Sequence, residues 1–173
     1  MEKTVYNGKF IKVTEEEIEG KTYERAYVIE PIIILPFNEK GELLIIKEKR
    51  LHEKPKIRWK LVTGVYEKDV SLEENVNREL QEEIGKKASK IKHYLTVKTT
   101  GTLNEVKRYF IATGLIDSKI PNPDGEDSII KVKPLSLEKV VEKTLKGKLS
   151  TGTTGYVLLK LYHDIIEGKI SIE

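Results

Sequence analysis

The sequence predicts an α/β protein of the α+β kind, in which a mixed sheet is covered by helices. Short aliphatic runs such as PIIILP (31–36) and ELLIIK (42–47) have the length and composition of strands. The segments 72–84, 136–147 and 153–167 carry helix signals instead. Because strands and helices do not alternate strictly along the chain, this order indicates a sheet with helices packed against it.

The strand predictions follow from weak alternation and from turn residues. The runs 31–36 and 42–47 are joined by Asn38-Glu39-Lys40-Gly41, and we expect them to form a hairpin with a buried face. NPDGED (122–127) has the composition of a loop. The other expected strands are 4–5, 10–13, 22–29, 59–62, 90–98, 105–115 and 129–133.

The helix predictions depend on capping residues. Ser71 followed by Glu74 is a capping box, and Gly85 is suited to the C′ position, so a helix is expected from 72 to 84. Ser136 is expected to cap a second helix that ends at Gly147. In the third helix, the residues expected to face inward are Val157, Leu158, Leu161 and Ile165.

The composition excludes several classes of protein. The chain has 173 residues, the length of one ordinary domain, and no cysteine, which excludes disulfides, thiolate nucleophiles and cysteine zinc sites. A net charge of +3 is too small to indicate nucleic-acid binding. The N-terminus lacks the apolar region of a signal peptide, and no apolar run is long enough to span a membrane. We therefore expect a cytoplasmic protein, and its many Lys and Glu residues with a single glutamine fit a thermophile.

Like charges are crowded in RELQEEIG (78–85). Glu79 and Glu83 are four residues apart and therefore stack on one helix face, at the border of the apolar stripe, where a hard cation such as Mg²⁺ would relieve their repulsion. Arg78 and Glu82 point more toward solvent. Taken alone, this helix is more readily interpreted as a solvated face with i,i+4 ion pairs, including one from Glu74 to Arg78. The stripe consists of Leu72, Val76, Leu80 and Ile84.

Seven residues at fixed spacing over 22 positions change this interpretation. They resemble the Nudix box, and they are Gly64, Arg78, Glu79, Leu80, Glu82, Glu83 and Gly85. WKLVTG (59–64) and EKR (48–50) are similar to WELPAG and QYR of ADP-ribose pyrophosphatases. The resemblance implies a Nudix α/β/α sandwich with a mixed sheet over 31–173, preceded by N-terminal strands (1–30) that serve dimerisation.

The chain departs from the family pattern at several positions, which bear on rate and on substrate identity. Val70 stands at the position of the first glutamate of the box, where Glu67 or Asp69 would have to substitute. The other departures are Lys86 at the last position of the box, Lys60, Val62 and Thr63 within the WELPAG-like segment, and Thr100 at a position that is commonly proline.

The resemblance implies metal ligands for Mg²⁺ or Mn²⁺. Glu79 and Glu83 are implied as direct ligands, Glu82 as a further or water-mediated one, and the Thr63 carbonyl as a backbone ligand. Arg78 is implied to orient Glu79, with a surface ion pair to Glu74 as the alternative. Glu82 and Arg78 are thereby expected to be catalytic.

The resemblance places the general base at Glu126, with Asp127 as the alternative and a plain acidic turn as the competing interpretation. Arg50 and Arg58 are candidates for binding the terminal phosphates or the ribose of the substrate, and either could equally be a solvated surface residue. Arg58 is more readily explained as a surface residue. Glu105 aligns with an acidic residue that assists metal or substrate, although pairing with a lysine on the strand surface is the simpler explanation.

The implied activity is Mg²⁺-dependent hydrolysis of ADP-ribose to AMP and ribose 5-phosphate by a homodimer acting on a small-molecule nucleotide. The same chemistry on a nucleotide sugar or dinucleotide is the second reading. A nucleotide-binding or regulatory protein with weak catalysis is the third, and Val70 and Lys86 motivate it.

Overall fold

The structure is a computed structural model that describes residues 1–51, 53–121, 128–149 and 152–172. Its strands and helices follow one another in the order β1 (Lys3–Asn7), β2 (Ile11–Ile18), β3 (Lys21–Val28), β4 (Pro31–Pro36), β5 (Leu43–Lys49), β6 (Ile57–Lys60), β7 (Val62–Val65), α1 (Leu72–Ile84), β8 (Lys86–Thr99), β9 (Leu103–Asp117), β10 (Ile129–Leu135), α2 (Leu137–Leu145) and α3 (Thr153–Ile166).

The strands form two sheets. The larger has the order β1-β2-β3-β9-β4-β7, with β8 also paired to β9, and the smaller has the order β10-β5-β6. The larger sheet is mixed, because β9 runs parallel to β3 and β4 but antiparallel to β8.

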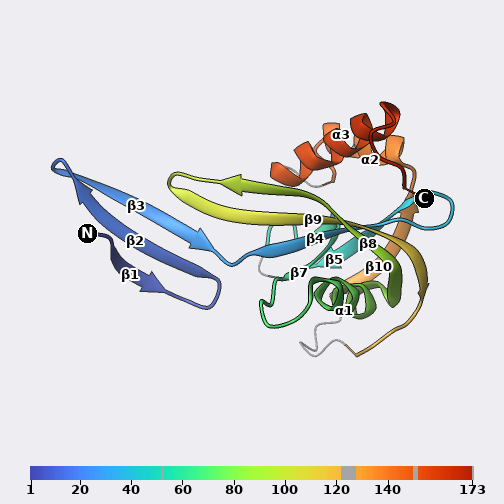
Figure 1. The fold of residues 1–173 in the computed structure, drawn as a ribbon, viewed down its shortest axis with the longest axis horizontal. Coiled ribbons are helices and arrows are strands. Elements are labelled where there is room, and N and C mark those ends of the chain that lie inside the picture. Colours follow the sequence, from blue (N-terminus) through green and yellow to red (C-terminus); the bar gives the residue numbers. More distant parts are fainter. Residues whose placement is uncertain (52, 122–127, 150–151, 173) are drawn as a thin grey trace.

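Helices cover both faces of the central strands (Figure 1). Strand β4 shows why: Ile32 and Ile34 point into a core shared with α1, whereas Ile33 and Leu35 point into a second core shared with α2 and α3. A strand whose two faces are both buried is apolar throughout, as the run PIIILP is. The predicted α/β/α sandwich with a mixed sheet is therefore confirmed.

The predicted hairpin of 31–36 and 42–47 is wrong. Strand β4 lies between β9 and β7, whereas β5 lies in the other sheet between β10 and β6. The turn at 38–41 joins them, and the pairing at this junction consists of one bridge, Phe37 to Leu43, next to hydrogen bonds between Asn38 and Glu42. The turn residues predicted the reversal of the chain correctly. The two apolar runs, however, pair with strands that come later in the sequence: β4 with β7 and β9, and β5 with β6 and β10.

The three N-terminal strands project from the body of the molecule as an arm (Figure 1). The arm, residues 3–28, joins the rest of the sheet where β3 pairs with β9, at Ala26 with Leu103 and Tyr27 with Asn104. In the part of the chain that the structure describes, no helix is long and apolar enough to cross a membrane.

Candidate active site

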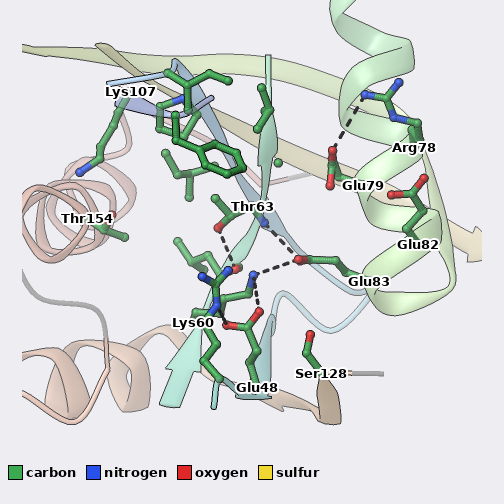
Figure 2. Close-up of a pocket in the computed structure, with 18 of the residues that line it drawn as sticks. Glu48, Lys60, Thr63, Arg78, Glu79, Glu82, Glu83, Lys107, Ser128 and Thr154 are labelled. Atoms are coloured by element: carbon green, nitrogen blue, oxygen red, sulfur yellow. Dashed lines mark hydrogen bonds and ion pairs between the residues drawn. The ribbon is translucent and has the colours of Figure 1, made fainter. Parts of the chain in front are cut away.

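A pocket of about 790 Å³ lies between α1 and strands β5 to β7 (Figure 2). Acidic and basic residues are interleaved along its wall. The charged residues of its wall are Lys9, Glu48, Arg50, Arg58, Lys60, Glu67, Arg78, Glu79, Glu82, Glu83 and Lys107.

Helix α1 presents the glutamates to this pocket. Its start is the predicted capping box, in which the Ser71 hydroxyl accepts from the Glu74 N–H and the Glu74 carboxylate accepts from the Ser71 N–H. It ends at Gly85, whose φ of 66° is left-handed. Val76 and Leu80 are completely buried, and this fixes the rotation of the helix so that the adjoining face, with Glu79 and Glu83, lines the pocket. Leu72, by contrast, is 36% exposed and does not extend the stripe as expected.

The loop before α1 is held by a buried amide. The Asn75 side chain is fully buried, and its Nδ2 donates to the carbonyls of Glu67, Val70 and Ser71 at 2.9–3.1 Å. Its Oδ1 accepts from the Glu67 N–H at 3.1 Å. Asn75 therefore fixes this loop, in which Val70 contributes a backbone carbonyl.

Glu79 has weaker ion pairing than Glu48 and Glu83, two other largely buried carboxylates of the pocket wall. Its side chain is 14% exposed, and its ion pair with Arg78 is long, at 4.0 Å. Burial, and then the charges of Glu83 and Glu82, raise the pKa of Glu79 to about 7. Gly64 lies directly beneath it: a Cβ on Gly64 would be 2.0 Å from the Glu79 Cδ atom. Only glycine leaves room for this carboxylate.

Arg78 reaches across to the loop. Its Nη1 donates to the Glu67 carboxylate at 3.0 Å and its Nη2 to the Asn75 Oδ1 at 3.4 Å. The alternative ion pair to Glu74 is not the arrangement found, because Glu74 is engaged by Ser71. Arg78 thus lies between Glu67 and Glu79.

Glu83 points away from Glu79, toward strand β6 (Figure 2). Its side chain is 12% exposed; Lys60 Nζ donates to Oε1 at 2.9 Å, and the Thr63 N–H donates to Oε2 at 3.2 Å. Burial raises the pKa of Glu83, although Lys60 opposes the shift. Glu83 is therefore a desolvated carboxylate with both oxygens hydrogen-bonded.

Lys60 also contacts Glu48, which lies on β5 and is 3% exposed. The Lys60 Nζ is 3.3 Å from Glu48 Oε1, while Arg50 and Arg58 donate to Oε2 at 3.0 and 3.2 Å. Burial alone would raise the pKa of Glu48, but Lys60 and Arg50 outweigh it, and the pKa is lowered. A buried anion thus gathers three cations at one end of the pocket.

The sequence interpretation missed Glu48 as a site residue and treated Lys60 only as a departure from a pattern. A period-two signal was present, since Glu48 shares a strand face with Leu44 and Ile46, which are buried. The register pairs Ile46 with Lys60 and Glu48 with Arg58, so all four point toward α1. Charges on a buried strand face were the available clue.

The other predicted site residues are spread over the pocket and its surroundings. Glu82, Thr63 and Arg50 line the pocket, and Arg50 also pairs with Glu53 at 3.3 Å. Glu105 pairs with Lys107 at 2.8 Å, and it is Lys107 that lines the pocket. The predicted bases, Glu126 and Asp127, lie outside the described residues.

The donor set is suited to a hard cation. Carboxylate oxygens are the ligands that Mg²⁺ and Mn²⁺ take in proteins, and Glu79, Glu82 and Glu83 bring three carboxylates to one wall. Within the residues that the structure describes, no three acidic or histidine side chains converge closely enough to hold an ion in the present rotamers. The reason is visible in Figure 2, where Glu83 is turned to Lys60 and Glu79 to the Arg78 side.

Comparisons with known proteins agree with this geometry. The family model described as NUDIX domain matches residues 29–152, well over half of the chain. Among solved structures, the crystal structure of an ADP compounds hydrolase is similar with a TM-score of 0.77 and 18% identity, covering 98% of this chain and 93% of that chain. At that identity the likeness concerns the fold. A search of curated proteins finds no match.

Proposed function

Because the chain belongs to the Nudix family and is a hydrolase of the Nudix pyrophosphatase type, we propose that its substrate is ADP-ribose, cleaved with Mg²⁺ to AMP and ribose 5-phosphate. The solved structure with the similar fold is that of an ADP compounds hydrolase, and a pocket of about 790 Å³ has the size of small-molecule sites.

The observation that carries the proposal is the desolvated, repelling pair of Glu79 and Glu83. Both side chains are less than 15% exposed, and the pKa of each is raised. Lys60 offsets the charge of Glu83, but Glu79 has the long Arg78 pair as its ion pair among the described residues, so holding Glu79 beside Glu83 is unfavourable unless a further cation offsets its charge. A helix face selected only for solubility would leave them in water.

In this proposal Glu79, Glu82 and Glu83 hold Mg²⁺ or Mn²⁺, with the Thr63 carbonyl as a further ligand, and Glu83 would have to turn from Lys60 to join them. The bound ion would neutralise phosphate charge and lower the pKa of the attacking water. Arg78 keeps the carboxylate of Glu79 in place from the opposite side, since it is anchored to Glu67 and Asn75. Arg78 is thus a positioning residue.

Substrate contacts are assigned to the basic part of the wall. Arg50 is proposed to bind a phosphate, because its planar guanidinium can keep the contacts to Glu48 with Nε and to Glu53 with Nη1 and offer Nη2 to the pocket. Glu105 is proposed to act indirectly, by holding Lys107 at the pocket. Glu126 is proposed as the general base, with Asp127 as the alternative.

Residues 1–30 are proposed to form a dimerisation element. Six apolar side chains of the arm and its turns are 42–59% exposed, which is unusual for a group of this size on a monomer: Val5, Tyr6, Phe10, Ile11, Ile18 and Tyr23. Light scattering after size exclusion should give twice the chain mass. A Tyr6→Asp/Tyr23→Asp variant should give the chain mass, and an unchanged mass would contradict this assignment.

The activity is tested with a panel of ADP-ribose, nucleotide sugars, dinucleoside polyphosphates and nucleoside triphosphates, each with Mg²⁺ and with chelator. Chelator-sensitive release of AMP from ADP-ribose is the expected result. Turnover of another member alone would retain the mechanism and replace the substrate. No turnover on any member would favour the alternative of a nucleotide-binding protein with weak catalysis. The observation that supports this alternative is Lys60, whose ammonium pairs with Glu48 and Glu83 within the pocket.

A further inference from the structure

Lys60 occupies a central position among the acidic groups of the pocket. It is 9% exposed, and its ammonium lies 2.9 Å from Glu83 Oε1 and 3.3 Å from Glu48 Oε1. Lys60 thus forms ion pairs with two carboxylates that are themselves largely withdrawn from water. It is therefore a fixed positive charge within the site.

The two ends of the acidic wall are neutralised unequally. At the Lys60 end, each oxygen of Glu83 and of Glu48 accepts from a described donor. At the other end, Glu79 has Arg78 at 4.0 Å as its ion-pair partner among the described residues. An added cation would thus meet repulsion from Lys60 at one end and uncompensated negative charge at the other.

We infer that Lys60 takes the place of one divalent cation in this site: it neutralises Glu83 and Glu48 and limits the chain, in the absence of nucleotide, to one tightly bound divalent ion at the Glu79 end. This inference rests on the proposed function. Lys60 is here a positioning residue, which holds the Glu83 carboxylate toward β6 instead of toward Glu79.

The test is a titration with Mn²⁺ alone, followed by the electron paramagnetic resonance signal of the free ion and by calorimetry, on the full chain without nucleotide. The unchanged chain is expected to bind one ion tightly. Lys60→Met, which removes the charge and retains most of the side-chain volume, is expected to bind a second ion at least about tenfold more tightly than any second ion of the unchanged chain. Lys60→Arg, which keeps the charge, should resemble the unchanged chain.

Lys86→Met is the matched control, because Lys86 also pairs with a carboxylate, Asp117 at 2.6 Å, but lies outside the pocket wall. It should bind Mn²⁺ as the unchanged chain does. Circular dichroism and thermal melting check that each variant is folded. If Lys60→Met does not fold, Lys60→Gln, which can still donate to Glu83, takes its place.

Equal stoichiometry and affinity in the unchanged chain and in the neutral Lys60 variants would overturn the inference, as would two tight ions in the unchanged chain. Glu79→Gln separates this failure from failure of the proposed function. If Glu79→Gln abolishes the first ion while the Lys60 variants change nothing, only the role of Lys60 is refuted. If neither the unchanged chain nor the Lys60 variants bind Mn²⁺, the metal assignment and the inference both fail.

Discussion

Replacing Gly64 by alanine should inactivate the enzyme while leaving it folded. An alanine Cβ at this position would lie 2.0 Å from Glu79 Cδ and 2.1 Å from Glu79 Oε1. Ordinary carbon contacts are about 3.5 Å or longer, so the carboxylate has to move by about 1.5 Å. A displacement of about 1 Å in a catalytic constellation lowers the rate about a hundredfold, and kcat/KM should fall by at least that factor.

The stability of Gly64→Ala should change little, because Gly64 lies on β7 with no left-handed φ and the clashing group is the flexible end of Glu79. Alanine also restricts the unfolded chain, which raises the free energy of unfolding by up to about 1 kcal/mol and offsets part of any strain in the folded state. The assay is AMP release from ADP-ribose with Mg²⁺, together with thermal melting.

The matched control is Gly168→Ala. Gly168 has a φ of 66°, has open space where a Cβ would lie, and is not among the residues that line the pocket. It should lose about 1 kcal/mol of stability and keep the activity of the folded enzyme. Wild-type turnover in Gly64→Ala would refute the role of Glu79, and equal rate losses in both alanine variants would refute the steric argument.

Three further results are expected. Glu83→Gln should lower turnover by orders of magnitude with the fold intact, as circular dichroism and steady-state kinetics would show, and full activity would remove Glu83 from the ligand set. The pKa of Glu79 is about 7 in the folded chain and near 4.5 when unperturbed, so the folded chain binds more protons than the unfolded chain between these pH values. The free energy of unfolding of the metal-free protein should therefore fall, by at most about 3 kcal/mol, as the pH rises from 4.5 to 7. Glu79→Gln should reduce this pH dependence in urea unfolding experiments, and an unchanged dependence would contradict the assignment. Glu126→Gln should lower kcat more than it changes KM, and unchanged kcat would transfer the base to Asp127.

The parts of the fold that depend on neighbouring residues were predictable. The bounds and both caps of α1 follow from Ser71, Glu74 and Gly85, which lie within or next to the helix that they end. The partition of β4 and β5 into separate sheets was not predictable, because the partners of β4 include β9, more than 70 residues away in sequence. Local patterns carry no information on such pairing.

Some residues of the site could likewise be predicted from neighbouring residues, and others depend on pairing between distant strands. The spacing of Glu79 and Glu83 on one helix was enough to place both in one wall. The cluster around Glu48 depends on the cross-strand register of β5 and β6, which sets Glu48 opposite Arg58 and Ile46 opposite Lys60. The contact between Glu83 and Lys60 depends on the packing of α1 next to β6, so it could be recognised only in the structure.

The junction of the arm with the body has a consequence for local unfolding. Strand β3 is tied to β9 by the pairs at Ala26 and Tyr27, so the arm can open without disturbing the buried contacts of α1. Its amide hydrogens should exchange with solvent faster than those of α1. Lys9 and Phe10 belong to the arm and line the pocket, so opening of the arm is expected to remove them from the wall while Glu79 and Glu83, on α1, stay in place. The wall of the pocket is thus built from parts of the chain that are expected to open at different rates.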